Sequence, residues 1–409
     1  MNAPGPSARH PVVFFCYARP AGFSGQKEAT ELVMRGLAER GWDCRSLPQP
    51  VLDRDTGGRG AVVRFAGGLV AAWARALRLL AAPDAALCVN LGLTWPAFAR
   101  DAVPLLLGRL GIGRSRITVS LHGSLFMQWE PDSLKARVFR LLLLQAGVIT
   151  VLGANQRWRL IALGVPGPRV EVVINSCALP PLSAAQFHAK WAALPGKPRP
   201  LRLLHLSSLI ATKGFPEYLE AVAALAARPG VPLEVVLCGK VTASEFQDRF
   251  ADAAAAERWI GEMIARLNRS DRVKARWVRG AVGAEKAALF RDADVFVLPT
   301  RYAVEAQPLV LLEAMAAGCA IITTRVGEIP TILDDSAAIF LGAGTAEELA
   351  AALEEWSGRP EALAGYAGAA HRRFVAQYAL AHHLDGWEAR LAPARPVTLG
   401  PVEPVRSES

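Results

Sequence analysis

Short apolar runs typical of β-strands alternate with longer helical patterns along most of this 409-residue sequence. Most of the strand candidates are continuously apolar, as strands covered by helices on both faces are. Such alternation indicates parallel sheets built from right-handed strand–helix–strand units. The expected strands are 12–17, 85–90, 117–121, 147–152 and 170–174 in the front half, and 201–206, 233–238, 273–278, 295–298, 320–324 and 338–341 in the back half.

The length of the chain predicts two domains, because it exceeds what one ordinary core contains. Five prolines between residues 179 and 200 mark the boundary, directly before a new expected strand. We therefore expect an α/β protein with two Rossmann-like domains, residues 1–185 and 200–370, whose parallel sheets face each other across a cleft. A C-terminal helix at about residues 375–391 is expected to pack back on the first domain, and the proline-rich tail 392–409 to be disordered.

The basic residues are concentrated in the front half of the chain. Residues 1–190 carry 22 Lys and Arg against 11 Asp and Glu, whereas the remainder carries 24 against 26. This excess suits an anionic lipid surface or an acidic acceptor, and an arginine-rich sequence that spreads charge for solubility explains it equally well. Basic and aromatic residues are not interleaved, so no nucleic-acid partner is expected.

The remaining composition favours a cytoplasmic protein. No opening segment resembles a signal peptide. The most apolar stretches, around 69–80 and 141–152, are short or carry arginines, and they are expected to fall short of a membrane span. The six cysteines are scattered without a C-x-x-C pair, which is typical of buried thiols in a reducing compartment.

Two glutamates, Glu305 and Glu313, are the strongest functional signal. Glu305 follows the expected strand 295–298, and Glu313 lies near the first turns of a helical run that ends at Gly318. In an open α/β sheet, ligands bind at the carboxyl ends of the strands, and a helix amino terminus there attracts phosphate. Carboxylates repel phosphate but accept hydrogen bonds from sugar hydroxyls. The stretch therefore predicts a site that holds phosphate and sugar together.

Other polar residues fall at the same expected edge. His122 follows the strand 117–121, and this position favours function over a structural histidine. The loop from Gly22 to Gly25 allows close approach of a ligand to the backbone, but a plain tight turn is equally consistent with it. Lys213 precedes Gly214 and can reach a diphosphate, although a lone lysine is more often solvated.

The sequence Asp292-Ala-Asp294 has the form of a metal-binding motif. It lies before the strand 295–298, at the amino edge of the sheet and away from the ligand edge. We interpret it as a turn and expect no metal site.

Taken together, these residues resemble the family 4 retaining glycosyltransferases (glycosyl transferases group 1), which have the GT-B fold. The spacing of Glu305 and Glu313 and the Ala-Met-Ala-Ala-Gly that follows are similar to the family pattern. The Glu-x-Gln-Pro-Leu variant resembles capsule and exopolysaccharide transferases. The resemblance is strong for residues 201–335 and looser in the front half.

The resemblance implies roles for individual residues. His122, near the reaction centre, and Glu305, on hydroxyls of the donor sugar, would be catalytic. Glu313 would contact the nucleotide ribose and Lys213 the diphosphate. The donor-binding residues implied in this way are Gly25, Ser208, Lys213, Gly214, Gln307, Pro308, Leu309 and Glu313.

Two departures from the family pattern stand out. Many relatives carry a basic residue where this chain has Ser207-Ser208, and glycines after the first glutamate, where it has Ala306-Gln307-Pro308. Proline has no N–H to donate to a phosphate, but it suits the first turn of a helix.

The implied function is retaining transfer of a hexose-type sugar from a nucleotide-sugar to a saccharide or lipid-linked acceptor in polysaccharide biosynthesis, without a metal or other cofactor. We expect a cytoplasmic location, peripheral at the inner face of the membrane, with an anionic membrane surface as a further partner. One alternative is a non-catalytic relative that binds a partner enzyme or polymer, which Ser207-Ser208 favours. The other is an NAD-dependent Rossmann enzyme, against which the missing G-x-G-x-x-G fingerprint argues. The sugar, the base and the acceptor stay open.

Overall fold

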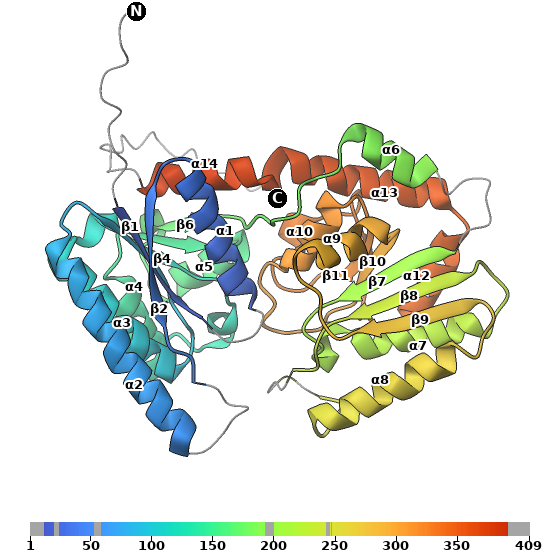
Figure 1. The fold of residues 1–409 in the computed structure, drawn as a ribbon, viewed down its shortest axis with the longest axis horizontal. Helices are drawn as coiled ribbons and strands as arrows, with labels where there is room; N and C mark the ends of the chain where they lie inside the picture. The colour runs from blue at the N-terminus through green and yellow to red at the C-terminus, as the bar shows by residue number, and fades with distance from the viewer. Residues whose placement is uncertain are drawn as a thin grey trace, which may run out of the picture.

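The computed structural model describes residues 12–19, 24–52, 59–192, 200–242, 246 and 248–391. These residues form two six-stranded parallel sheets flanked by helices (Figure 1). The strand order is β2-β1-β3-β4-β5-β6 in the N-terminal half and β12-β11-β10-β7-β8-β9 in the C-terminal half. The predicted α/β class with two Rossmann-like sheets is confirmed. Gly22 and the tail 392–409 lie outside the described residues.

The elements of the N-terminal half are β1 (Val12–Ala18), α1 (Gly25–Glu39), β2 (Asp43–Gln49), α2 (Arg59–Ala76), η1 (Leu77–Ala81), β3 (Ala86–Asn90), α3 (Trp95–Gly111), η2 (Arg114–Arg116), β4 (Ile117–Ser120), η3 (Leu125–Gln128), α4 (Leu134–Leu143), β5 (Val148–Val151), α5 (Ala154–Ala162), η4 (Gly167–Arg169) and β6 (Val170–Val172).

The connection and the C-terminal half contain α6 (Ala184–Ala192), β7 (Leu201–Leu206), η5 (Ala211–Lys213), α7 (Phe215–Ala226), β8 (Leu233–Cys238), α8 (Ala253–Leu267), β9 (Val273–Val278), α9 (Gly283–Asp292), β10 (Val295–Leu298), α10 (Leu309–Ala316), β11 (Ala320–Thr324), α11 (Ile329–Ile332), β12 (Ile339–Leu341), α12 (Ala346–Ser357), α13 (Pro360–Arg373), η6 (Phe374–Tyr378) and α14 (Leu380–Leu391).

Strand β2 was not expected from the sequence. It lies at the edge of its sheet and pairs only with β1, so much of it is exposed. Its exposed Asp43 and Arg45 form an ion pair at 2.8 Å. The expectation of five strands in the N-terminal half was therefore wrong, because an edge strand does not need the continuous apolar run that identified the others.

Helix α14 runs back from the C-terminal half and packs against α1 (Figure 1). Arg40 Nη1 lies 2.7 Å from a carboxylate oxygen of both Asp385 and Glu388. A Cβ atom at Gly36 would lie 2.5 Å from Leu384 Cδ1, so the absence of a side chain permits this close packing.

The loops at the carboxyl ends of the two sheets contact each other. After β5, the backbone N–H of Gln156 donates to Glu328 Oε1 at 2.7 Å. Close by, the Asn155 side chain donates to the carbonyl of Gly327 at 3.4 Å. After β6, the N–H of Asn175 donates to Gln307 Oε1 at 2.5 Å. The ligand edges of both sheets therefore meet at one interface.

Helix α2 is longer than the sequence indicated. With η1 it forms a helical segment, Gly60–Ala81, of 22 residues that is long and apolar enough to cross a membrane by length and composition alone. The expectation that this stretch falls short of a span was therefore wrong. Arg64, Gly67 and Gly68 interrupt the apolar run without interrupting the helix. One such helix is weak evidence for a membrane span, since core helices pass the same test.

Candidate functional site

Lys213 and Glu305 are in contact at the ends of neighbouring strands. Lys213 follows β7, and its Nζ lies 3.1 Å from Oε2 of the buried Glu305. The same ammonium lies 4.8 Å from the ring centroid of Tyr302. Gly214 has a φ of +89°, and a Cβ there would lie 2.5 Å from the carbonyl oxygen of Pro299. Only glycine lets the chain turn into α7 this close to β10, which holds Lys213 beside Glu305.

The amino ends of α1 and α10 face each other across the interface. A Cβ on Gly25, the first residue of α1, would lie 3.7 Å from Cδ1 of Leu309, the first residue of α10. Ser24 caps α1 by accepting from the N–H of Lys27 at 3.5 Å. Pro308 provides no side-chain cap for α10. Because both helix ends carry partial positive charge, this part of the interface suits an anion.

Among the described residues near this helix end, several buried polar atoms have no hydrogen-bond partner. They include Nε2 of Gln307 and Oε2 of Glu313. Buried polar atoms in native proteins nearly always have a partner. Both atoms come from residues predicted to bind the donor, and a polar ligand at this position would supply what they lack.

Glu313 belongs to a buried charge cluster that joins the two halves. Lys286 of α9 lies with Nζ 2.6 Å from Glu313 Oε1 and 3.6 Å from Oε2 of Glu28 on α1. Burial raises the pKa of Glu313 to about 7, although Lys286 opposes this. Burial lowers the pKa of Lys286, but Glu313 and Glu28 outweigh it and the net pKa is raised. The charged ammonium of Lys286 therefore pairs with the carboxyl groups of both Glu313 and Glu28.

His122 follows β4, with Nε2 3.2 Å from Ser120 Oγ. Its ring lines a small cavity of about 10 Å³, together with Asn175 and His383. Burial, and next the neighbouring His383, lowers the pKa of His122 to about 4. The imidazole is therefore neutral near pH 7 and offers one N–H donor and one acceptor nitrogen there.

The His122 turn and the Glu305 loop are linked through Gln156 and Asn175. The Gln156 side chain donates to Ser124 Oγ at 2.8 Å, while its backbone N–H donates to Glu328. Beside Glu328, a Cβ on Gly327 would lie 2.1 Å from the carbonyl oxygen of Glu305. Asn175 lines the His122 cavity and also donates to Gln307. The predicted residues of both halves therefore border one interface.

Ser207 and Ser208, the predicted departure from the family pattern, are held by local hydrogen bonds. Ser207 Oγ lies 2.9 Å from Nε2 of His205, whose Nδ1 lies 3.0 Å from the carbonyl oxygen of Val297. Burial lowers the pKa of His205 to about 3, so this ring is neutral as well. The carbonyl of Ser208 accepts from the N–H of Ile210 at 2.8 Å. Neither serine brings a positive charge to the position.

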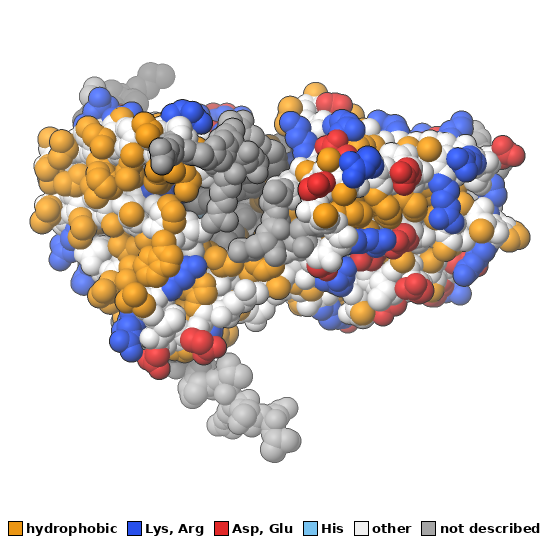
Figure 2. Space-filling model, turned by 90° about the horizontal axis from the view of Figure 1, so that it is seen from below, with side chains coloured by type: hydrophobic (Ala, Val, Ile, Leu, Met, Phe, Trp, Pro, Cys, Tyr) orange, Lys and Arg blue, Asp and Glu red, His pale blue; other side chains and the backbone are white. Residues whose placement is uncertain are grey.

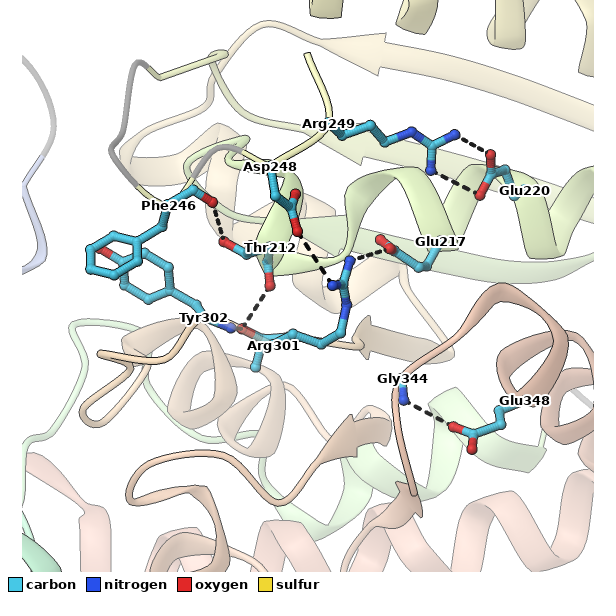
Figure 3. Close-up of polar contacts among 11 residues, drawn as sticks. Thr212, Glu217, Glu220, Phe246, Asp248, Arg249, Arg301, Tyr302, Gly344 and Glu348 are labelled. Carbon is cyan, nitrogen blue, oxygen red and sulfur yellow. Dashed lines mark hydrogen bonds and ion pairs between the residues drawn. The ribbon is translucent and has the colours of Figure 1, made fainter. Parts of the chain in front are cut away.

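Arg301 follows β10 and contacts Thr212, Glu217 and Asp248 (Figure 3). Its guanidinium lies 2.6 Å from Glu217 Oε1 and 3.4 Å from Asp248 Oδ2, and its backbone N–H donates to Thr212. The ring of Phe246 packs edge-on against Tyr302, with centroids 5.1 Å apart. Arg301 is therefore paired with two carboxylates and ties the loop after β10 to α7.

Asp294 of the Asp292-Ala-Asp294 motif has a structural role. Oδ2 of the buried Asp294 accepts the N–H of Arg202 at 3.0 Å, which joins the start of β10 to β7. This contact agrees with its interpretation as a turn at the amino edge of the sheet.

Comparisons with known proteins bear on the fold and on the C-terminal half. Residues 200–357 match the protein family described as glycosyl transferases group 1. A search of curated proteins found no match.

Several solved structures share the overall fold. HepE from Anabaena, solved with UDP and glucose, has a TM-score of 0.65 at 15% identity and covers 94% of this chain and 100% of its own. Sucrose-phosphate synthase from Thermosynechococcus elongatus has a TM-score of 0.66 at 19% identity, covering 92% of this chain and 98% of its own. A glycosyltransferase from Rickettsia africae has a TM-score of 0.64 at 12% identity, covering 94% and 100%. The chain therefore has the GT-B fold.

Lys286 and Glu28 were missed by sequence reasoning. Lys286 lies in an ordinary-looking helical run with acidic and basic neighbours, and no motif distinguishes it. Its contacts arise only when α9, α10 and α1 come together, so the sequence holds no signal for them. The predicted roles of the site residues themselves stay predictions.

Proposed function

We propose that this protein transfers a sugar from a nucleotide-sugar donor to an acceptor hydroxyl group. The observation that carries the proposal is the contact of Lys213 with Glu305 beside the amino end of α10. A lysine and a helix amino end suit the diphosphate, and a carboxylate suits the sugar hydroxyls. The group 1 domain supports the same activity, and HepE was solved with UDP-glucose.

In this proposal the donor opens the ion pair between Lys213 and Glu305 and binds both side chains. Without donor, Lys213 and Glu305 neutralise each other at 3.1 Å. The diphosphate draws the ammonium of Lys213 to itself and leaves the Glu305 carboxylate free for the hydroxyls of the sugar. Glu313 turns its unpartnered Oε2 to the ribose, and the Gln307 amide donates to the donor.

The chemistry that fits this arrangement is retaining transfer by front-side attack. The bond between the sugar C1 and the diphosphate oxygen breaks, and a bond from C1 to the acceptor oxygen forms on the same face. The acceptor proton passes to the departing phosphate oxygen. Lys213 and the start of α10 stabilise the negative charge that develops on the diphosphate, so the step needs neither a metal nor a covalent enzyme intermediate.

The acceptor class follows from the family resemblance. A saccharide or lipid-linked acceptor would place the enzyme in polysaccharide biosynthesis, in the cytoplasm and at the inner face of the membrane. The donor sugar is proposed to be of the hexose type. The rival is a non-catalytic protein of the same fold that binds a partner enzyme or polymer, which the uncharged Ser207 and Ser208 favour.

A thermal-shift screen against UDP-, GDP- and dTDP-sugars tests the proposal, followed by measurement of nucleotide release. A bound donor stabilises the fold by about 2.7 kcal/mol at one hundred times its Kd. We expect one donor class to raise the Tm and to be turned over. Lys213→Ala should lose both effects, and Lys274→Ala, an exposed lysine of β9, should keep them.

A donor that shifts the Tm without any release of nucleotide, even with a range of saccharide acceptors, would favour the non-catalytic rival. No shift with any nucleotide-sugar, or an equal shift in Lys213→Ala, would contradict the proposed donor site.

A further inference from the structure

Helix α2 presents an apolar side to solvent. A surface helix usually pairs an apolar inner face with a polar outer face. Here the inner residues Ala72 and Leu79 are buried in the N-terminal half, yet Val63 and Val70 on the outer side are 69% and 64% exposed. The exposed apolar residues of this segment are Val62, Val63, Val70, Leu77 and Leu80.

Helix α3 extends this surface. Its last residue, Gly111, packs so closely on η1 that a Cβ would lie 2.1 Å from the carbonyl oxygen of Leu79. The end of α3 therefore packs on η1, and Leu106 and Leu110 of α3 are 50% and 78% exposed. We call the surface formed by Val62, Val63, Val70, Leu77, Leu80, Leu106 and Leu110 the α2 face. Hydrophobic side chains gather over the N-terminal half in Figure 2, whereas acidic and basic side chains mix over the C-terminal half.

The charges around the α2 face are mostly positive. Arg64, Arg78 and Arg109 are exposed on the helices that form it. Residues 60–83 contain no Asp or Glu. Asp84, at the far end, lies 3.6 Å from Arg116, which offsets its charge. An apolar face with an arginine border is complementary to a lipid surface that carries anionic headgroups.

We propose that the α2 face docks on an anionic phospholipid surface, with α2 lying in the plane of the interface. The helix does not need to span the bilayer, because Ala72, Ala76 and Leu79 hold its inner side on the N-terminal half. A second copy of the chain fits less well. A two-fold contact would bring the arginine border of one copy against that of the other, without acidic residues on α2 to pair with it.

Docking in this way would also position a lipid-linked acceptor, and this point alone rests on the proposed function. A Cβ on Gly68 of α2 would lie 3.0 Å from Cβ of Pro50, the residue after β2, so α2 passes the carboxyl edge of the sheet, where His122 also lies. A lipid-linked acceptor held in the membrane would then lie close to the proposed site. The lipid contact itself is independent of the activity.

Cosedimentation of the full-length protein with vesicles tests the proposal. We expect binding to phosphatidylcholine vesicles that contain phosphatidylglycerol, weaker binding to phosphatidylcholine alone, and release at high salt. The double variant Val63→Glu/Val70→Glu should weaken binding by about tenfold or more. The control Val282→Glu alters an equally exposed valine, 70% accessible, in the C-terminal half and should bind as the wild type does.

Charge is tested separately with Arg64→Gln/Arg78→Gln. This variant should lose about fivefold in affinity per arginine on anionic vesicles only. Thermal melts of each variant check that the fold is intact.

Three outcomes would overturn the proposal. The first is that the wild type does not bind anionic vesicles at low salt. The second is that the Val282→Glu control loses as much vesicle affinity as Val63→Glu/Val70→Glu does. The third is that light scattering detects dimers without lipid and that Val63→Glu/Val70→Glu converts them to monomers. The last would identify a second copy as the occupant. None of these results would change the thermal shift with nucleotide-sugars, so the two proposals fail separately.

Discussion

Lys213 Nζ lies 3.1 Å from Glu305 Oε2, although 92 residues separate them in sequence. The contact exists because β7 and β10 are neighbours in the sheet, so the loops that follow them share one edge. Both side chains are largely buried. Because each buried charge needs a partner, removal of either residue would leave the other charge uncompensated.

Replacing Glu305 tests its proposed contact with the donor sugar. Glu305→Gln keeps the size of the side chain but removes the charge that accepts hydroxyl hydrogen bonds. Turnover of the nucleotide-sugar should fall by about 100-fold, with a smaller change in KM for the donor. Steady-state kinetics measures both parameters. Wild-type turnover in this variant would remove Glu305 from the catalytic residues.

Glu313 should make stability depend on pH. Its pKa is about 7 in the folded protein against a usual value of 4.5, so the folded state binds more protons between these two values. The stabilisation is fully present below pH 4.5 and is lost as the pH rises through 7. The free energy of unfolding of Glu313→Gln, relative to that of the wild type, should therefore rise by about 3 kcal/mol from acid to mildly alkaline pH. Urea unfolding across this range checks the gain, and a pH-independent difference would contradict it.

His122 should stay neutral through the physiological range. Its pKa of about 4 lies below the usual 6.5, so its contribution to stability is present above pH 6.5 and is lost as the pH falls through 4. NMR of the histidine rings should show no titration of His122 between about pH 5.5 and 8. Assignment by the His122→Gln variant identifies the signal. A midpoint near 6.5 would show that the ring is solvated, in conflict with its position in the cavity.

Gly214 should resist substitution more than a glycine with free space around it. In Gly214→Ala the new Cβ would meet the Pro299 carbonyl oxygen at 2.5 Å with φ at +89°. The matched control is Gly283→Ala, where φ is +55° but no atom lies within 4 Å. Gly214→Ala should lower the free energy of unfolding by about 1–3 kcal/mol more than the control does. Equal losses would mean that the contact with Pro299 relaxes at little cost.

Much of the fold was predictable because buried parallel strands have a distinctive composition. The strand Val295–Leu298 was expected with the bounds that the structure has, since all four residues are buried. Edge strand β2 was not predicted, because its exposed residues interrupt the continuous apolar run that identifies a buried strand. The charge cluster of Lys286 and the exposed apolar side of α2 were not predicted for a different reason. Both depend on which elements become neighbours, and a local pattern does not contain that information.

The most direct test of the donor site is a crystal structure with a bound nucleotide-sugar. We predict the diphosphate between Lys213 and the amino end of α10, and the sugar hydroxyls on Glu305 with its ion pair to Lys213 opened. A donor bound elsewhere, with the Lys213–Glu305 pair still closed at 3.1 Å, would contradict the proposal.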